Sequence, residues 1–303
     1  MKSKYHVYQI NSFTNEAFTG NPAGVVSNAN GLTEAQMQLI AREMNNSETA
    51  FIFQPETKDA GYDVEVRFFT PTTEVPICGH ATIAAHYVRA LEKKALPGQT
   101  FFQKTKAGIL PVEIIGDEEN IRIKMTQGQA SFRTIAFTDQ QSILQALGIT
   151  EDERDANCPI QIVSTGHSKI MIGIKSRNKL NQLSPELNEL VLLSKKLDCN
   201  GFFVFSFDSE DPQILTYGRM FAPAIGIAED PVTGNANGPL GAYLVENKIV
   251  PHNGRNFSFI GKQGEALKRP GTVAVSVGIL NDHPVKIEII GNAVSVFKTT
   301  IEI

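Results

Sequence analysis

Two six-residue stretches, Pro76-Ile77-Cys78-Gly79-His80-Ala81 and Pro231-Val232-Thr233-Gly234-Asn235-Ala236, have nearly the same pattern and stand 155 positions apart (76 to 231) in a chain of 303 residues. Each stretch ends a polar, turn-rich segment and begins an apolar segment with the composition of a helix. The first turn of a helix has backbone N–H groups without intrahelical partners, and such groups bind carboxylates readily. We therefore expect two helix starts that face one small anion.

The similarity extends upstream of these stretches. Three earlier pairs of segments match in the same order at separations of 152 or 153 positions: Leu39–Met44 with Leu192–Leu197, Ala50–Phe53 with Phe202–Phe205, and Phe69–Pro71 with Phe221–Pro223. A repeat this long is too large for a solenoid and predicts two sister domains, as does the chain length. We expect an N-terminal domain over residues 1–127 and a C-terminal domain over 128–303, with the last strand returning to the first domain as an option.

The local patterns mix strands and helices. Alternating apolar residues predict strands in both halves, and the C-terminal part from Phe257 onward reads as nearly all strand. Capping-box pairs predict two helix starts, at Thr33 with Gln36 and at Thr138 with Gln141. The helices that begin at His80 and Asn235 are apolar on most sides, which is typical of buried helices. We predict an α+β fold of two pseudo-symmetric domains from an internal duplication, each with a curled, mostly antiparallel sheet around a central helix.

Composition excludes several classes of function. The net charge of −4 argues against a nucleic-acid-binding protein, and the absence of a run of 18 apolar residues argues against a membrane protein. The first residues lead into a strand at Tyr5–Phe13 and not into an apolar signal core. Three sparse cysteines, Cys78, Cys158 and Cys199, suit a reducing compartment, so we expect a cytoplasmic protein.

No cofactor is expected. The histidines lack the spacing of metal ligands, and neither a Walker loop nor a dinucleotide-binding glycine pattern is present. The expected partners are a small-molecule carboxylic acid and a second copy of the chain in a homodimer, with no nucleic acid and no membrane.

Glu48 is the first candidate for catalysis. It lies at a turn between a predicted helix and strand, and the corresponding place in the second half is Asn200-Gly201. A carboxylate that is present in one half only is expected of a general acid/base, since a carboxylate shielded from water can exchange a proton near neutral pH. A solvated turn glutamate or a cap is the structural alternative.

The helix starts supply further candidates. His80 could donate to a substrate or carry a proton near neutral pH, or it could be an ordinary polar residue of a first helical turn. Asp230 could be a hydrogen-bond acceptor or a second proton carrier across a cleft from Glu48, or it could favour a turn and the helix dipole. Asn235 could contact substrate or act as an N-cap. Gly79 and Gly234 would let the backbone approach a ligand.

Cys78 and Thr233 occupy matching places and carry a different hypothesis. A racemase with two bases on such a duplication would have thiols at both, and here one is a hydroxyl. A thiol at a helix start can be reactive. An epimerase or dehydratase of an amino or imino acid that uses Cys78 with Thr233 is therefore the second enzyme hypothesis, and a small buried residue is the structural alternative for Cys78.

Five motifs in order resemble the phenazine-biosynthesis isomerase (PhzF-like) family over nearly the whole chain. They are Gly20–Val26, Asn46–Phe51, Phe69–Pro71 with Glu74–Pro76, Cys78–Thr82 and Glu229–Ala236. The resemblance implies a diaminopimelate-epimerase-like fold with the site between two domains, and cofactor-free isomerisation of a cyclic dihydro-hydroxyanthranilate-type acid by proton transfer.

The resemblance also implies residue roles. Glu48 matches the family's acid/base glutamate, Gly79 and His80 match its substrate-contacting pair, and Asp230 matches its cleft aspartate. Asn235 stands where the phenazine enzyme has a serine, so that substrate contact differs. We expect a cofactor-independent isomerase in which Glu48 moves the proton; a non-catalytic ligand-binding or interaction protein on the same fold is the third hypothesis.

Overall fold

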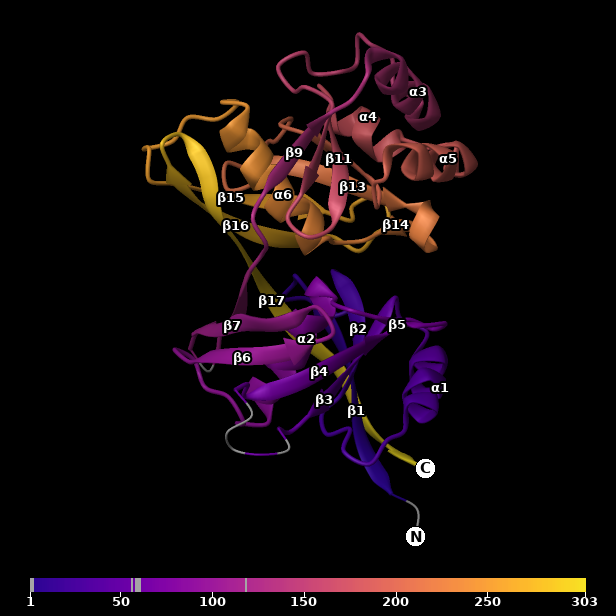
Figure 1. Ribbon diagram of the computed structural model, residues 1–303, viewed down its shortest axis with the longest axis vertical. Coiled ribbons are helices and arrows are strands. Elements are labelled where there is room, and N and C mark those ends of the chain that lie inside the picture. The colour runs from indigo at the N-terminus through magenta and orange to yellow at the C-terminus, as the bar shows by residue number, and fades with distance from the viewer. Residues whose placement is uncertain (1–2, 56, 58–60, 118) are drawn as a thin grey trace. The chain divides into compact units, whose positions relative to one another are not determined.

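The computed structural model describes residues 3–303 apart from 56, 58–60 and 118, and it divides into two compact units (Figure 1). Unit 1 comprises Met1–Thr126 together with Ile290–Ile303, and unit 2 comprises Gln127–Ile289. The chain therefore passes between the units one residue before the expected boundary. The C-terminal unit does not run to residue 303, because the end of the last strand belongs to unit 1.

Unit 1 contains ten helices and strands within the described part of residues 1–126, together with the C-terminal part of the last strand. Its elements are β1 (Lys4–Ser12), β2 (Asn21–Val26), α1 (Glu34–Met44), β3 (Glu48–Phe53), β4 (Val64–Phe69), β5 (Glu74–Val75), α2 (Gly79–Leu91), β6 (Thr100–Thr105), β7 (Gly108–Gly116), β8 (Ile121–Thr126) and the last part of β17 (His283–Glu302).

The strands of unit 1 form a sheet that curls around α2. The pairs β1–β2, β3–β4, β6–β7 and β7–β8 are antiparallel, and β2–β3 and β4–β6 are parallel. β17 pairs with β1 and with β8. α2 contacts β1, β2, β3, β4 and β8 and is buried over most of its length, as its composition predicts.

Both ends of the described chain lie in unit 1. The Ser3 N–H donates to the Ile303 carbonyl at 2.9 Å, and the Ile303 N–H returns a bond to the Ser3 carbonyl at 3.0 Å. Figure 1 shows β1 and the yellow end of β17 running together toward the two termini. The first and last strands of the chain are therefore neighbours.

Unit 2 carries more helices on the outside of its sheet. Its elements are β9 (Ser131–Thr134), α3 (Phe137–Leu147), β10 (Gln161–Ser164), β11 (Ser168–Gly173), α4 (Arg177–Gln182), α5 (Leu187–Leu197), β12 (Phe202–Ser206), β13 (Thr216–Ala222), the short 3₁₀ helix η1 (Pro223–Ile225), β14 (Ile227–Asp230), α6 (Gly234–Glu246), β15 (Asn256–Gln263), β16 (Gly271–Leu280) and the first part of β17.

The strands of unit 2 pair in the same order as those of unit 1. The pairs β10–β11, β12–β13 and β15–β16 are antiparallel, and β11–β12 and β13–β15 are parallel. The short strand β14 pairs with β13 just as β5 pairs with β4. α6 follows β14, is almost entirely buried, and contacts β10, β11, β15 and β16.

The other face of the unit 2 sheet is covered by an apolar cluster. Leucines and isoleucines of α3, α4 and α5 pack there with Ile170, Ile172, Phe202 and Val204 of the central strands. The burial of apolar side chains in such a cluster is the main source of stability for a folded unit. The sheet of unit 2 therefore lies between a buried helix and an outer helical layer.

The two capping-box predictions have different outcomes. Thr33 caps α1, and the Gln36 side chain returns the bond, so that prediction is confirmed. The prediction for Thr138 is wrong, because α3 begins at Phe137 with Ala136 as its N-cap residue. Gln140 bonds instead to the Ile135 carbonyl at 2.8 Å, which leaves Thr138 inside the first turn.

Within the described residues, no helix combines the length and the hydrophobicity needed to cross a lipid bilayer.

Candidate active site

Glu48, His80 and Cys78 meet in unit 1. Glu48 begins β3, Cys78 is the N-cap residue of α2, and His80 lies in the first turn of α2. His80 Nε2 lies 3.4 Å from Glu48 Oε2, and Cys78 Sγ lies 3.4 Å from His80 Nδ1. Only 9% of the His80 side chain and 13% of the Glu48 side chain are exposed. The imidazole thus bridges a carboxylate and a thiol in a largely water-free place.

Neighbouring groups fix the position of His80 but leave part of Glu48 available. Ser47 Oγ lies 3.2 Å from His80 Nε2, and Ser12 Oγ donates to the His80 carbonyl at 2.8 Å. Glu48 Oε2 is buried and has no hydrogen-bond partner within the described part of the chain. Buried polar atoms are rarely left in this state without a functional reason. This oxygen is therefore placed to take a proton or to contact a ligand.

The same three side chains have the spacing of a metal site but not its geometry. One donor atom from each lies within 4.8 Å of the others. Cys78 and Glu48, however, approach opposite nitrogens of the His80 ring, and one metal ion would bind through only one of those nitrogens. The arrangement suits the movement of a proton along a thiol, an imidazole and a carboxylate.

Among the residues that the structure describes, the starts of α2 and α6 have no side-chain cap, and the same is true of α3 and α5. Thr33 and Ser176 cap α1 and α4 through their hydroxyl groups. The N-cap residues Cys78 and Thr233 make no such bond within the described residues, and neither helix has an acidic residue in its first turn. Backbone N–H groups at both helix starts therefore remain available to an anion.

Asp230 is held by its neighbours at the start of α6. The Thr233 hydroxyl donates a short hydrogen bond to Asp230 Oδ2. Gln263 Nε2 donates to the Asp230 carbonyl at 2.8 Å, and Gln263 Oε1 accepts from the Thr233 N–H at 3.0 Å. The Thr233 hydroxyl is thus engaged as a donor to Asp230, and this bond fixes the orientation of the Asp230 carboxylate.

Asn235 is not the N-cap of α6, because Thr233 holds that position. The structural alternative for Asn235 is therefore wrong. Gln127 Nε2 donates to Asn235 Oδ1 at 3.0 Å and to the Gly234 carbonyl at 3.1 Å, and Gln127 Oε1 accepts from Thr165 Oγ1 at 2.9 Å. The first turn of α6 is in this way tied to the β10–β11 turn.

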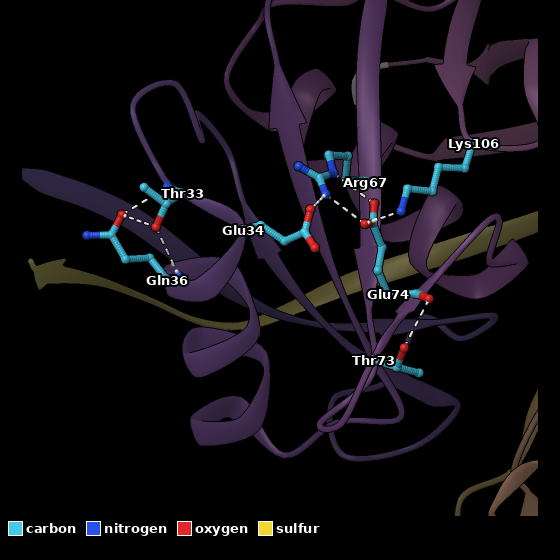
Figure 2. A network of polar contacts seen from close by, with 7 residues as sticks. All are labelled: Thr33, Glu34, Gln36, Arg67, Thr73, Glu74 and Lys106. Carbon is cyan, nitrogen blue, oxygen red and sulfur yellow. Dashed lines mark hydrogen bonds and ion pairs between the residues drawn. The ribbon is translucent and has the colours of Figure 1, made fainter.

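An arginine–glutamate pair precedes each helix start. In unit 1, Arg67 of β4 donates through Nε and Nη2 to Glu74 of β5 at 2.7 and 2.6 Å (Figure 2). In unit 2, Arg219 of β13 donates through Nε and Nη2 to Glu229 of β14 at 2.8 and 2.7 Å. Each pair fastens the short strand that leads into the central helix.

Figure 2 also shows that Lys106 reaches Glu74 and that Glu34 of α1 reaches Arg67. Burial disfavours the charged form of Glu74, but the hydrogen bonds from Arg67 and Lys106 outweigh it and lower the pKa of Glu74 below its ordinary value. Glu74 and Glu229 are therefore structural acids, in contrast to Glu48.

The candidates predicted from sequence form two groups. Glu48, Gly79 and His80 lie together in unit 1, and Asp230, Gly234 and Asn235 lie together in unit 2. Lys169 of β11 was not predicted, although it is 4% exposed and interacts electrostatically with Asp230. No local pattern marks it, because every residue of β11 from Lys169 to Gly173 is buried.

A family model and several relatives of known sequence place the chain in the same family. The model of the phenazine biosynthesis-like protein family (PhzC-PhzF) matches residues 10–299. An uncharacterised isomerase of Clostridium acetobutylicum is 57% identical over 99% of this chain and 98% of its own length. The uncharacterised isomerase YddE of Escherichia coli K12 is 48% identical over 97% of both chains.

Solved structures agree with this result. A Bacillus anthracis phenazine biosynthesis protein of the PhzF family has a TM-score of 0.88 and 30% identity over 99% of this chain and 100% of its own. A hydroxyproline epimerase of Agrobacterium vitis has a TM-score of 0.65 at 11% identity over 100% of this chain and 94% of its own, which shows a shared fold alone. The chain therefore belongs to the phenazine biosynthesis-like family and is an enzyme of the isomerase class.

Proposed function

We propose that the protein is a cofactor-independent isomerase that moves a proton within a small cyclic carboxylic acid, with Glu48 as the single general acid/base. The observation that carries this proposal is Glu48 Oε2, a buried carboxylate oxygen with no hydrogen-bond partner in the described residues, 3.4 Å from His80 Nε2. A shielded carboxylate beside an imidazole can remove a proton from one carbon and return it to another.

The other candidate residues take supporting roles in this proposal. The backbone N–H groups in the first turns of α2 and α6, with Gly79 and Gly234, bind the substrate carboxylate. His80 and Asp230 orient polar substituents and stabilise charge that develops in the transition state. Asn235 contributes to the shape and hydrogen bonding of the substrate site.

We also propose that the two units arose by internal duplication. The matching order of strand pairs supports this idea, and so do the paired arginines and glutamates. Arg67 and Arg219 stand 152 positions apart, and Glu74 and Glu229 stand 155 apart, as in the sequence repeat. In each unit, the arginine also lies over a phenylalanine two residues onward, Phe69 at 5.2 Å and Phe221 at 4.9 Å.

The difference between the units favours one base over two. Glu48 starts β3 in unit 1, whereas Gly201 precedes β12 in unit 2 and has no side chain to move a proton. The alternative enzyme hypothesis needs Cys78 and Thr233 as a pair. The Thr233 hydroxyl donates to Asp230, so Thr233 is poorly suited as a proton acceptor, and this contact argues against that alternative.

The test is solvent deuterium exchange into a panel of cyclic carboxylic acids, measured by mass spectrometry. We expect the wild-type protein to exchange at least one acid and Glu48→Gln to exchange none while still binding it. Glu43→Gln, at an exposed position of α1, is the matched control. Deuterium exchange by Glu48→Gln at the wild-type rate would disprove the proposed role of Glu48.

Cys78→Ala separates the remaining hypotheses. If that variant is inactive while Glu48→Gln is active, the thiol-dependent epimerase or dehydratase hypothesis is correct. If the wild-type protein binds acids but incorporates no deuterium into any of them, the non-catalytic binding hypothesis is correct.

A further inference from the structure

Lys169 is a buried cation on the face of the unit 2 sheet that α6 covers. It is 4% exposed. Its neighbours Ile170 and Ile172 belong to the apolar cluster under α3, α4 and α5. Successive side chains of a strand point to opposite faces, so Lys169 and Met171 point toward α6, which contacts β11.

The ammonium of Lys169 is poorly satisfied by the protein. An ammonium has three N–H donors. Lys169 Nζ donates to the Ser168 carbonyl at 3.3 Å. Within the described residues, no carboxylate oxygen lies within 4.0 Å of Nζ, so the ammonium forms no ion pair there. A buried charge without a close partner is strongly disfavoured unless a ligand supplies the counter-charge.

A chain of hydrogen bonds and a charge interaction place the start of β11 near the start of α6. Thr165, in the turn before β11, bonds through Gln127 to Gly234 and Asn235 of the first turn of α6. The charge of Asp230, which lies four residues before the first residue of α6, favours the charged form of Lys169. The ammonium and the uncapped N–H groups of α6 therefore lie at the same end of unit 2.

We propose that Lys169 is the charged part of an anion-binding site at the start of α6, where its ammonium binds the substrate carboxylate together with the backbone N–H groups of that helix. This inference rests on the proposed function, because it names the residue that would recognise the acid. A helix start alone has only partial charge, whereas a buried ammonium would distinguish a carboxylate from a neutral group.

The site has a defined dependence on pH. Burial lowers the pKa of Lys169 from 10.5 to about 8, although Cys199 and Asp230 favour its charged form. The other group close to Lys169 is His167 in the preceding turn, whose own pKa is lowered by burial and by Lys169. A carboxylate binds the protonated lysine, so affinity is greatest below pH 8 and falls above it.

The experiment measures binding of cyclohex-1-ene carboxylate and of its uncharged amide by calorimetry. Lys169→Met keeps the length and removes the charge, Lys169→Arg keeps the charge, and Lys195→Met removes a charge from an exposed position on α5. We expect Lys169→Met to bind the acid about 10- to 100-fold more weakly. Its affinity for the amide should not change, and the other two variants should stay within a few-fold of wild type.

A wild-type pH series provides a readout that needs no variant. Affinity for the acid should fall between pH 7 and 9.5 in the wild type and not in Lys169→Met. Equal affinity of Lys169→Met and wild type for the acid, a wild-type profile that is flat, or no wild-type binding at millimolar acid would each overturn the inference. A failure of the Glu48 mechanism would instead appear as deuterium exchange by Glu48→Gln at the wild-type rate, and it would leave these affinities as expected.

Discussion

Arg219 and Glu229 form a two-pronged ion pair that joins β13 to β14 directly before α6 begins. The Nε and Nη2 atoms of Arg219 donate to the two carboxylate oxygens, and its Nη1 atom donates to the carbonyls of Leu180 and Leu183 at 3.0 and 2.7 Å. The side chains are 8% and 11% exposed. The pair therefore couples the outer helical layer of unit 2 to the strand that carries Asp230.

Removal of Arg219 from this ion pair should destabilise the protein. We expect Arg219→Met to lower the free energy of unfolding by about 3–5 kcal/mol, because Glu229 would remain buried without its counter-charge. Urea denaturation provides the measurement. Arg154→Met is the control, since the Arg154–Glu151 pair is more exposed and should contribute less than about 1 kcal/mol. Equal losses in the two variants would show that the pair is not a structural anchor.

His80 should matter for turnover more than for binding. We expect His80→Gln to slow deuterium exchange by about 10²- to 10⁴-fold, because the group that shares the proton with Glu48 is lost. Rates and affinities for the same acid should be measured together. His283→Gln alters an exposed histidine that also faces a glutamate, at 2.9 Å from Glu246, and should have no effect. A loss confined to affinity would assign His80 to binding alone.

Lys169 should make stability depend on pH in the alkaline range. Its pKa is about 8 in the folded protein against 10.5 for the ordinary side chain, so between these values the unfolded chain binds more protons and stability rises with pH. At pH 7, Lys169→Met should be more stable than wild type by up to a few kcal/mol, at ~1.4 kcal/mol per pKa unit. The difference should shrink between pH 8 and 10.5. A constant difference across that range would contradict the assignment.

His86 should make the protein sensitive to acid. Burial, with a further contribution from Arg89, lowers the pKa of His86 from 6.5 to about 3. The neutral ring donates from Nε2 to Gln103 Oε1 at 2.8 Å and accepts at Nδ1 from Arg89 at 3.1 Å. Below pH 6.5 the unfolded chain takes up a proton that the folded ring does not, so stability should fall toward pH 3.

The check on His86 is a series of urea midpoints from pH 7 to 4. We expect the wild type to lose a few kcal/mol over the full window, at ~1.4 kcal/mol per pKa unit, and His86→Gln to lose less. His252→Gln, at a partly exposed position outside the sheets, is the matched control and should follow the wild type. Parallel curves for wild type and His86→Gln would refute the prediction.

The sequence predicted the features that depend on local pattern. The apolar composition around His80 and Asn235 indicated buried helices, and the strand expected at Tyr5–Phe13 is observed at Lys4–Ser12. Thr33 with Gln36 was a true capping box because that helix starts in solvent, where its own side chains decide the cap. At Thr138 the same pattern misled, since the N-cap of α3 lies two residues earlier, at Ala136.

Features that depend on long-range contacts were beyond the sequence. Nothing local to Glu229 reveals Arg219 as its partner. The sequence also does not show that Glu229 forms a structural ion pair while the adjacent Asp230 accepts a hydrogen bond from Thr233. Lys169 looked like an ordinary strand residue, because a single lysine does not show which face of a sheet it occupies. The proximity of Glu48 to His80 likewise arises only when β3 meets α2.

The placement of β17 has a consequence for synthesis on the ribosome. β1 pairs along its whole length with residues between Ala293 and Glu302, which are synthesised after residues 127–289 of unit 2. The sheet of unit 1 should therefore stay open until this last part of β17 has been synthesised, when the residues of unit 2 are already complete. The nascent N-terminal half should need protection from aggregation, and removal of the final strand should leave its first strand without a neighbour on one side.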